Sequence, residues 1–246
     1  MQDPSLTDAP AALPLPSADG VLVKFTRATR TLSRLKTAII SGQLPPGERL
    51  IVSALSDSFE EGQTPVREAL MKLASEGYVV QEDQRGFRVA PVSRSELVHL
   101  TQMRAELEAL AVRWAIAHGS DDWEAGLLAA THRLLKLTKL GPDGHTIDPN
   151  WNERHLNFHQ ALVAACPNTV LLQMRNLLSD RAERYRHLSV RYLKAPRDDR
   201  AEHEAMAKAA LARDSARAEE LARAHVETTT RILLDEMDEG RPISAP

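Results

Sequence analysis

The chain has 246 residues, of which 43% are hydrophobic and 26% are charged, and its formal net charge is −3. This composition predicts a globular protein of one large or two modest domains, and it excludes a chain that is basic over its whole surface. No apolar run approaches the roughly 20 residues that span a bilayer, so we expect no membrane partner. The single cysteine, Cys166, cannot form an internal disulfide, which favours a reducing cytoplasm, and we expect this side chain to be buried.

The N-terminal segment divides into a tail and a slightly basic region. Residues 1–22 are rich in Pro, Ala, Ser and Asp and lack the pattern of a signal peptide, so we expect a disordered tail. Residues 23–92 carry ten lysines and arginines against eight acidic residues, whereas the remainder of the chain is acidic. A mildly basic domain on an acidic body is compatible with nucleic-acid contact through one face.

Two short helices are predicted next in the chain. Apolar residues at positions 32, 35, 39 and 40 predict a helix over residues 32–40. Leu44-Pro45-Pro46-Gly47 predicts a turn, because two prolines and a glycine do not continue a helix. A second short helix is expected over residues 53–59.

A third helix and a hairpin follow. Thr64 is the expected N-cap and Pro65 the first helical residue, and Gly77 ends the helix. Residues 78–80 and 87–90 read as two strands around a Gly-containing turn, which predicts a hairpin wing. The order helix, turn, helix, wing is that of a winged helix-turn-helix domain, which we place at residues 23–92.

From Ser93 onward, helical periodicity replaces every strand-like pattern. The expected helices are 94–118, 121–139, 148–166, 169–193, 199–213 and 215–238. Short links between helices imply an antiparallel bundle over residues 93–240. The predicted fold class is therefore mainly α, with a winged helix-turn-helix domain followed by an all-α bundle.

The winged domain predicts a protein that reads DNA. Its third helix would enter the major groove, where Arg67 can hold guanine or a phosphate and Thr64 can donate to a phosphate. Gln63 can bind adenine or a phosphate, and Arg85 at the wing tip can enter the minor groove. The alternative is an ordinary helical hairpin packed on a small sheet.

Four stretches of this domain resemble the GntR family of bacterial transcription regulators. Residues 40–50 and 64–70 look like its two most recognisable segments, and residues 77–80 and 85–89 look like its wing. The resemblance implies a regulator that binds double-stranded operator DNA.

The chain departs from the family just before the third helix. Members usually have a glycine, a small hydroxyl residue and an arginine there, at places that correspond here to Glu60, Gly62 and Gln63. We expect these departures to alter sequence preference and not to abolish binding. Arg49 and Gly86 complete the predicted DNA-binding set.

Four histidines in the second region predict a metal site. His155 and His159 are four residues apart and share an apolar face, and His203 and His225 lie on apolar faces of two later helices. Four inward imidazoles can converge on one divalent transition metal, with zinc expected first and nickel, copper or iron also suitable. The alternative for each histidine alone is an ordinary core or surface residue, which is what we expect of the other five.

The second region resembles the FCD domain, the all-helical ligand-binding domain of the FadR subfamily. Many members hold a metal through an Asp, a His four residues later and two further histidines. Phe158-His159, His203 and His225 match this pattern, and His155 stands where the family often has Asp. The resemblance implies an organic-acid effector, and an all-histidine set leaves the charge of the ion less compensated and more attractive to an anion.

Arg104 is the predicted partner of the effector carboxylate, because the segment around it resembles the first helix of the FCD domain. Arg184, Tyr185 and Arg186 are further candidates. The alternative for Arg104 is a surface ion pair with Glu108. Four segments resemble a glutarate-responsive repressor of the family, which implies glutarate or 2-hydroxyglutarate as the effector: 120–125, 154–159, 171–175 and 184–186.

The sequence thus predicts a homodimeric repressor that a dicarboxylate, bound at a metal site, releases from its operator. One alternative is a regulator of the same fold that senses another organic acid, and the residues alone do not separate repression from activation. The other alternative is a metalloenzyme, which we do not expect, because neither a His-Glu-x-x-His motif nor paired Glu-x-x-His motifs accompany these histidines.

Overall fold

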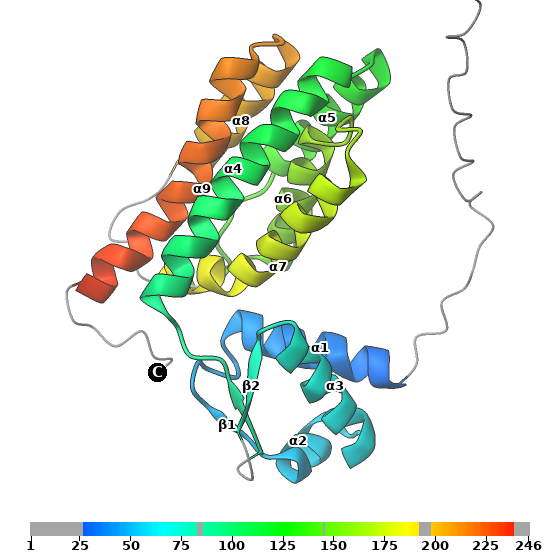
Figure 1. The fold of residues 1–246 in the computed structure, drawn as a ribbon, viewed down its shortest axis with the longest axis vertical. Helices are drawn as coiled ribbons and strands as arrows, with labels where there is room; N and C mark the ends of the chain where they lie inside the picture. Colours follow the sequence, from blue (N-terminus) through cyan, green and yellow to red (C-terminus); the bar gives the residue numbers. More distant parts are fainter. Residues whose placement is uncertain (1–26, 83–85, 145, 192–197, 239–246) are drawn as a thin grey trace, which may run out of the picture.

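The computed structural model describes residues 27–82, 86–144, 146–191 and 198–238 (Figure 1). The predicted disordered tail, residues 1–22, lies outside this range, and so does Arg85 at the predicted wing tip. No helix in the described part of the chain is long and apolar enough to cross a membrane.

The N-terminal part has the predicted order of helix, turn, helix and wing. Its elements are α1 (Arg27–Ser41), β1 (Arg49–Leu50), α2 (Val52–Phe59), α3 (Gln63–Ser75), β2 (Val79–Glu82) and β3 (Gly86–Val89). The three strands form an antiparallel sheet in the order β1-β3-β2, with Leu50 opposite Phe87 and Gln81 opposite Phe87 on the other side. Strand β1 was not predicted, because two residues carry no periodicity that a sequence pattern can detect.

The core of this part is the apolar stripe of α3 packed on α1 and the sheet. Val66, Leu70 and Leu73 are fully buried with Leu35. The predicted N-cap is wrong: Gly62 is the N-cap of α3 without a side-chain hydrogen bond, and Thr64 lies inside the first turn. Helix α1 also begins earlier than predicted. The buried Thr31 continues its packed face toward the N-terminus.

The C-terminal part is the predicted all-α bundle. Its helices are α4 (Arg94–His118), α5 (Asp121–Leu135), α6 (Pro149–Leu162), α7 (Thr169–Arg191), α8 (Asp199–Leu211) and α9 (Ser215–Asp238). Four of them begin at a side chain that accepts a hydrogen bond from the first turn, which satisfies backbone N–H groups that the helix cannot. These caps are Ser93, Ser120, Asp148 and Asp198.

Helix α5 is shorter than predicted because the chain after it folds back on itself. Leu140 and Ile147 form an isolated antiparallel bridge, and the N–H of Gly141 donates to the carbonyl of Thr146. The carbonyl of Lys139 accepts from the N–H of Asp148, so the chain turns back here and does not continue the helix. Helix α6 likewise ends at Leu162, four residues before the predicted end. Cys166, just beyond it, is buried as expected.

Helix α7 is a bundle helix that packs against α1 of the N-terminal part (Figure 1). The Nζ of Lys36 on α1 is 3.2 Å from the Oδ2 of Asp180, and the hydroxyl of Tyr78 donates to the backbone carbonyl of Asp180 over 2.6 Å. Arg184 donates to the carbonyl of Ala90 over 3.2 Å, in the segment that joins the two parts. Asp180 and Arg184 of α7 therefore connect the bundle to α1, to Tyr78 before β2 and to the segment between the two parts.

Candidate metal centre and ligand cavity

The four predicted histidines converge in the bundle. His155 and His159 lie one turn apart on α6, and His203 and His225 come from α8 and α9. One nitrogen of each ring can be chosen so that all four lie within 4.8 Å of one another. These four nitrogens would be the ligands of one divalent ion, for which imidazole nitrogen is a common donor.

Three of the imidazoles are held by an oxygen at Nδ1. Such partners fix the tautomer and ring orientation of metal-binding histidines and leave Nε2 for the ion. The three pairs are His159 with Glu108 Oε1 at 3.5 Å, His225 with Glu202 Oε2 at 2.7 Å, and His203 with the backbone carbonyl of Asp199. The sequence did not single out Glu108, Glu202 or Asp199.

The fourth imidazole, His155, is held by stacking. Its ring lies on that of Trp151 with centroids 4.6 Å apart, and its Nε2 is 3.1 Å from Nε2 of His159. Its Nδ1 is buried and has no hydrogen-bond partner among the described residues. Both Nε2 atoms would be ligands of a bound ion.

The protonation states suit a metal. Burial lowers the pKa of His155 well below its ordinary value, and the nearby His159 lowers it further. Burial also lowers the pKa of His159, by more than Glu108 raises it. Both rings are therefore neutral at pH 7, which is the form that binds transition metals. The donor set, its orientation and its protonation fit a divalent ion that prefers imidazole.

A buried ion pair supports this cluster. Arg175 Nε and Nη2 lie 2.6 and 2.7 Å from the two carboxylate oxygens of Glu108, and Nη2 also donates to the backbone carbonyl of His159. Burial raises the pKa of Glu108, but Arg175 and His159 outweigh that effect and hold it well below its usual range. Glu108 is thus a permanent anion whose charge Arg175 already matches.

A second carboxylate of this region, that of Glu183, is likewise paired with an arginine. Glu183 forms an ion pair with Arg186 and accepts from Asn152 Nδ2 over 3.2 Å. Burial raises the pKa of Glu183, but Arg186 and His187 outweigh it and lower the pKa to about 2. Two arginines of this region are therefore already matched by carboxylates.

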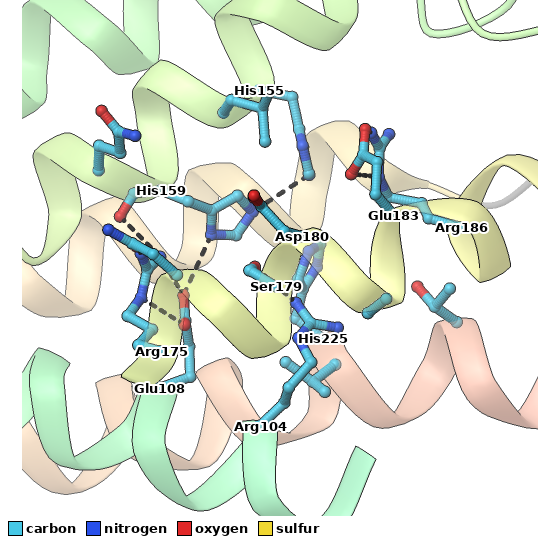
Figure 2. Close-up of a pocket in the computed structure, with 16 residues that line it drawn as sticks. Arg104, Glu108, His155, His159, Arg175, Ser179, Asp180, Glu183, Arg186 and His225 are labelled. Atoms are coloured by element: carbon cyan, nitrogen blue, oxygen red, sulfur yellow. Dashed lines mark hydrogen bonds and ion pairs between the residues drawn. The ribbon is translucent and has the colours of Figure 1, made fainter. Parts of the chain in front are cut away.

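Unlike Arg175 and Arg186, Arg104 has no carboxylate partner among the described residues, and it faces a cavity. The cavity has a volume of about 310 Å³ and is lined by Arg104, three of the four histidines, and residues of α7 (Figure 2). Arg104 donates to Ser179 Oγ over 3.3 Å, and no carboxylate among the described residues lies within 4 Å of its guanidinium. The expected alternative, an ion pair with Glu108, is not formed, because Glu108 pairs with Arg175.

Arg184 and Tyr185 do not line this cavity. Arg184 Nη2 and the Tyr185 hydroxyl bind Glu96 Oε2 at 2.8 and 2.9 Å, at the start of α4. The structure instead places Arg186 in the cavity wall. Neighbouring positions on a helix point about 100° apart, so the correct arginine depends on how α7 is rotated in the bundle.

The predicted DNA-binding residues lie on the N-terminal part. Gln63, Thr64 and Arg67 are exposed at the start of α3, and Arg49 is exposed on β1. Gly86 begins β3 with a φ of +89°, a conformation that side chains other than glycine rarely adopt. The structure thus presents the first turn of α3 to solvent, as a helix that enters a groove requires.

Comparison with known proteins agrees with this architecture. The model of the bacterial regulatory proteins of the gntR family matches residues 27–89, and that of the FCD domain matches residues 99–228. The HTH-type transcriptional repressor GlaR of Escherichia coli K12 is 42% identical over 210 residues, which cover 82% of this chain and 94% of GlaR. The uncharacterized HTH-type transcriptional regulator BphR of Paraburkholderia xenovorans LB400 is 34% identical over 82% of this chain and 83% of its own.

Among solved structures, McbR/YncC of E. coli superimposes with a TM-score of 0.67 at 23% identity, over 86% of this chain and 99% of that one. At this identity the similarity concerns the fold. The two family matches together span nearly all of the described chain. The chain therefore belongs to the GntR family of bacterial regulatory proteins, in the group that carries an FCD domain, and is a transcriptional regulator and not an enzyme.

Proposed function

We propose that this protein is a cytoplasmic, homodimeric repressor that a small dicarboxylate, glutarate or 2-hydroxyglutarate, releases from operator DNA. The effector would bind between Arg104 and a divalent metal held by the four histidines, zinc first and nickel second. The observation that carries the proposal is the convergence of four imidazoles, three of which line a cavity together with Arg104, which has no carboxylate partner among the described residues. Repression is supported by the relation to GlaR, and the effector by the resemblance to a glutarate-responsive member of the family.

The charges of the cavity favour a dianion. Glu108 and Glu183 are matched by Arg175 and Arg186, so Arg104 adds an uncompensated positive charge. Neutral histidines leave the +2 of a bound ion uncompensated, and that ion supplies open positions for carboxylate oxygens. A dicarboxylate matches both ends of the cavity, with one carboxylate toward the histidines and the other toward Arg104. A larger organic acid is the second candidate.

Helix α7 can carry the response to the DNA-reading part. Ser179, Asp180 and Glu183 line the effector cavity, and Asp180 and Arg184 also hold α1, Tyr78 and the segment between the two parts. An effector that takes Arg104 away from Ser179 would favour a different position of α7. Coupling requires that the effector bind the two positions with different affinity.

An apolar stripe on α7 supports the dimer. Val170, Met174 and Leu177 are spaced by four and three residues, so they share a face, and 65%, 48% and 49% of their surfaces are exposed. We assign this stripe to a second copy of the chain. A symmetric dimer would place two α3 helices against two half-sites of a pseudo-palindromic operator. Leu177→Glu should shift the protein toward monomers in sedimentation velocity, and an unchanged dimer would move the contact elsewhere.

The test is a gel shift on the DNA upstream of the protein's own gene, titrated with glutarate, 2-hydroxyglutarate and a sugar acid. Glutarate should release the DNA from the wild type, and His159→Ala should lose this release while it still binds the operator. His132→Ala, an exposed histidine on α5, is the matched control and should respond as the wild type does.

The outcomes separate the parts of the proposal. Equal glutarate potency on the wild type and His159→Ala would remove the metal from the mechanism. Release by the sugar acid alone would replace the effector and keep the site. Failure of the wild type to bind this DNA would contradict the proposed operator.

A further inference from the structure

A second cavity lies between the DNA-reading part and the bundle. It has a volume of about 360 Å³, within the usual range of small-molecule sites. Thr37, Ile40 and Tyr78 line it from the N-terminal side, and Ile147, Leu156 and Asp180 line it from the bundle. Ligand sites occur preferentially at such junctions between domains.

The two cavities share a wall. Leu156, Asp180 and Glu183 line both the metal cavity and this interdomain cavity. The proposed effector nevertheless does not suit the second cavity. Its lining contains neither Arg104 nor the four-histidine cluster, and of its two carboxylates Glu183 is already paired with Arg186, which leaves Asp180 beside Lys36. Asp180 is therefore the charged group of this cavity that can attract a cationic ligand.

The lining combines an apolar floor with an accessible carboxylate. Ile40, Ile147 and Leu156 present hydrocarbon, and 42% of Leu156 is exposed although it sits in the bundle. The Asp180 side chain is 62% exposed, and its described cationic partner, Lys36, approaches one oxygen at 3.2 Å. The carboxylate can therefore accept a second cation without giving up Lys36.

We propose that this interdomain cavity is a second ligand site, which takes a small amphipathic amine. The apolar body of the ligand lies against Ile40, Ile147 and Leu156, and its ammonium group donates to Asp180. Such a ligand contacts both parts of the molecule, so it stabilises the arrangement in which α1 and α7 are docked. Through the shared wall, it also changes the affinity of the metal cavity for its own ligand, and that coupling is reciprocal.

The test is calorimetric titration of the purified protein with 2-phenylethylamine, with 2-phenylethanol and phenylacetate as the neutral and anionic analogues. The amine should bind more tightly than the alcohol, and phenylacetate should not bind in this cavity. Asp180→Asn should lower the affinity for the amine by about two- to fivefold, as expected for a partly exposed ion pair, and should leave the affinity for the alcohol unchanged.

Two matched variants identify the site. Thr37 is exposed at the cavity wall on α1, so Thr37→Trp fills the cavity with little disturbance of the core. This substitution should lower the affinity for the amine by about tenfold or more. Ser33→Trp adds the same side chain one turn earlier on α1, outside the lining, and should bind the amine as the wild type does. Circular dichroism of all variants checks that they are folded.

The proposal is overturned if millimolar 2-phenylethylamine gives no heat, or if Thr37→Trp binds it as tightly as Ser33→Trp does. Equal binding of amine and alcohol, together with no effect of Asp180→Asn, would overturn the assignment to amines. Neither readout uses operator DNA or glutarate, so these outcomes are independent of the proposed function.

Discussion

Replacing Glu108 by glutamine should strongly destabilise the bundle. The substitution keeps the shape of the side chain and removes its charge. Glu108 and Arg175 are both almost completely buried; Nη2 of Arg175 donates to Oε1 over 2.7 Å, and Nε lies 2.6 Å from Oε2. Without the carboxylate, the Arg175 guanidinium stays in a buried place with no matching anion. Loss of one partner of such a pair costs about 3–5 kcal/mol.

A control on the same helix separates this effect from a general effect of charge. Glu106 is exposed and pairs with Arg223 at 3.3 Å, a contact that water screens. Glu106→Gln should therefore cost less than about 1 kcal/mol. A double variant, Glu108→Gln with Arg175→Met, should recover part of the lost stability, because it removes the unmatched charge.

The assay is urea unfolding followed by circular dichroism, with saturating zinc and separately with EDTA. The two conditions separate the lost ion pair from a change in metal affinity, since Glu108 also lies 3.5 Å from Nδ1 of His159. A loss below about 1 kcal/mol for Glu108→Gln in both conditions would refute the argument that burial makes this pair essential.

Three further predictions follow from other parts of the structure. Glu202→Gln should weaken zinc binding by about 10- to 100-fold in a competition with a chelating dye, because Glu202 orients His225 at 2.7 Å; an unchanged affinity would contradict that role. The pKa of Glu183 is lowered to about 2 by Arg186, so its contribution to stability is complete above its ordinary pKa and is lost as the pH falls from about 4.5 to 2. Glu183→Gln should therefore flatten the acid-unfolding curve in that window, and an unchanged curve would count against the pair. Glu60 has a φ of 55°, in the left-handed region that glycine adopts without strain. Glu60→Gly should relieve about 1–2 kcal/mol of strain and cost about 0.5–1 kcal/mol of chain entropy, so the folded state should become more stable. A higher Tm would show this gain, and an unchanged Tm would contradict it.

Local patterns determined the fold class. The stripe of Val66, Leu70 and Leu73 defines the buried face of α3, because residues three and four apart share one side of a helix. The same spacing put His155 and His159 on one face. Turn residues also marked the change from the wing to the bundle. The apolar faces of two later helices indicated His203 and His225, although no spacing along the chain connects them to the first pair, and the family resemblance then supported the same four residues.

Only the tertiary structure decided which charged groups meet. Glu108 is four residues from Arg104, a spacing that favours a pair on one helix, yet it binds Arg175, which lies 67 residues away. Arg184 was a reasonable effector ligand by resemblance, but the rotation of α7 turns it toward Glu96 and Ala90. Periodicity tells which face of a helix is apolar, whereas the partners of a buried charge depend on how separate helices pack.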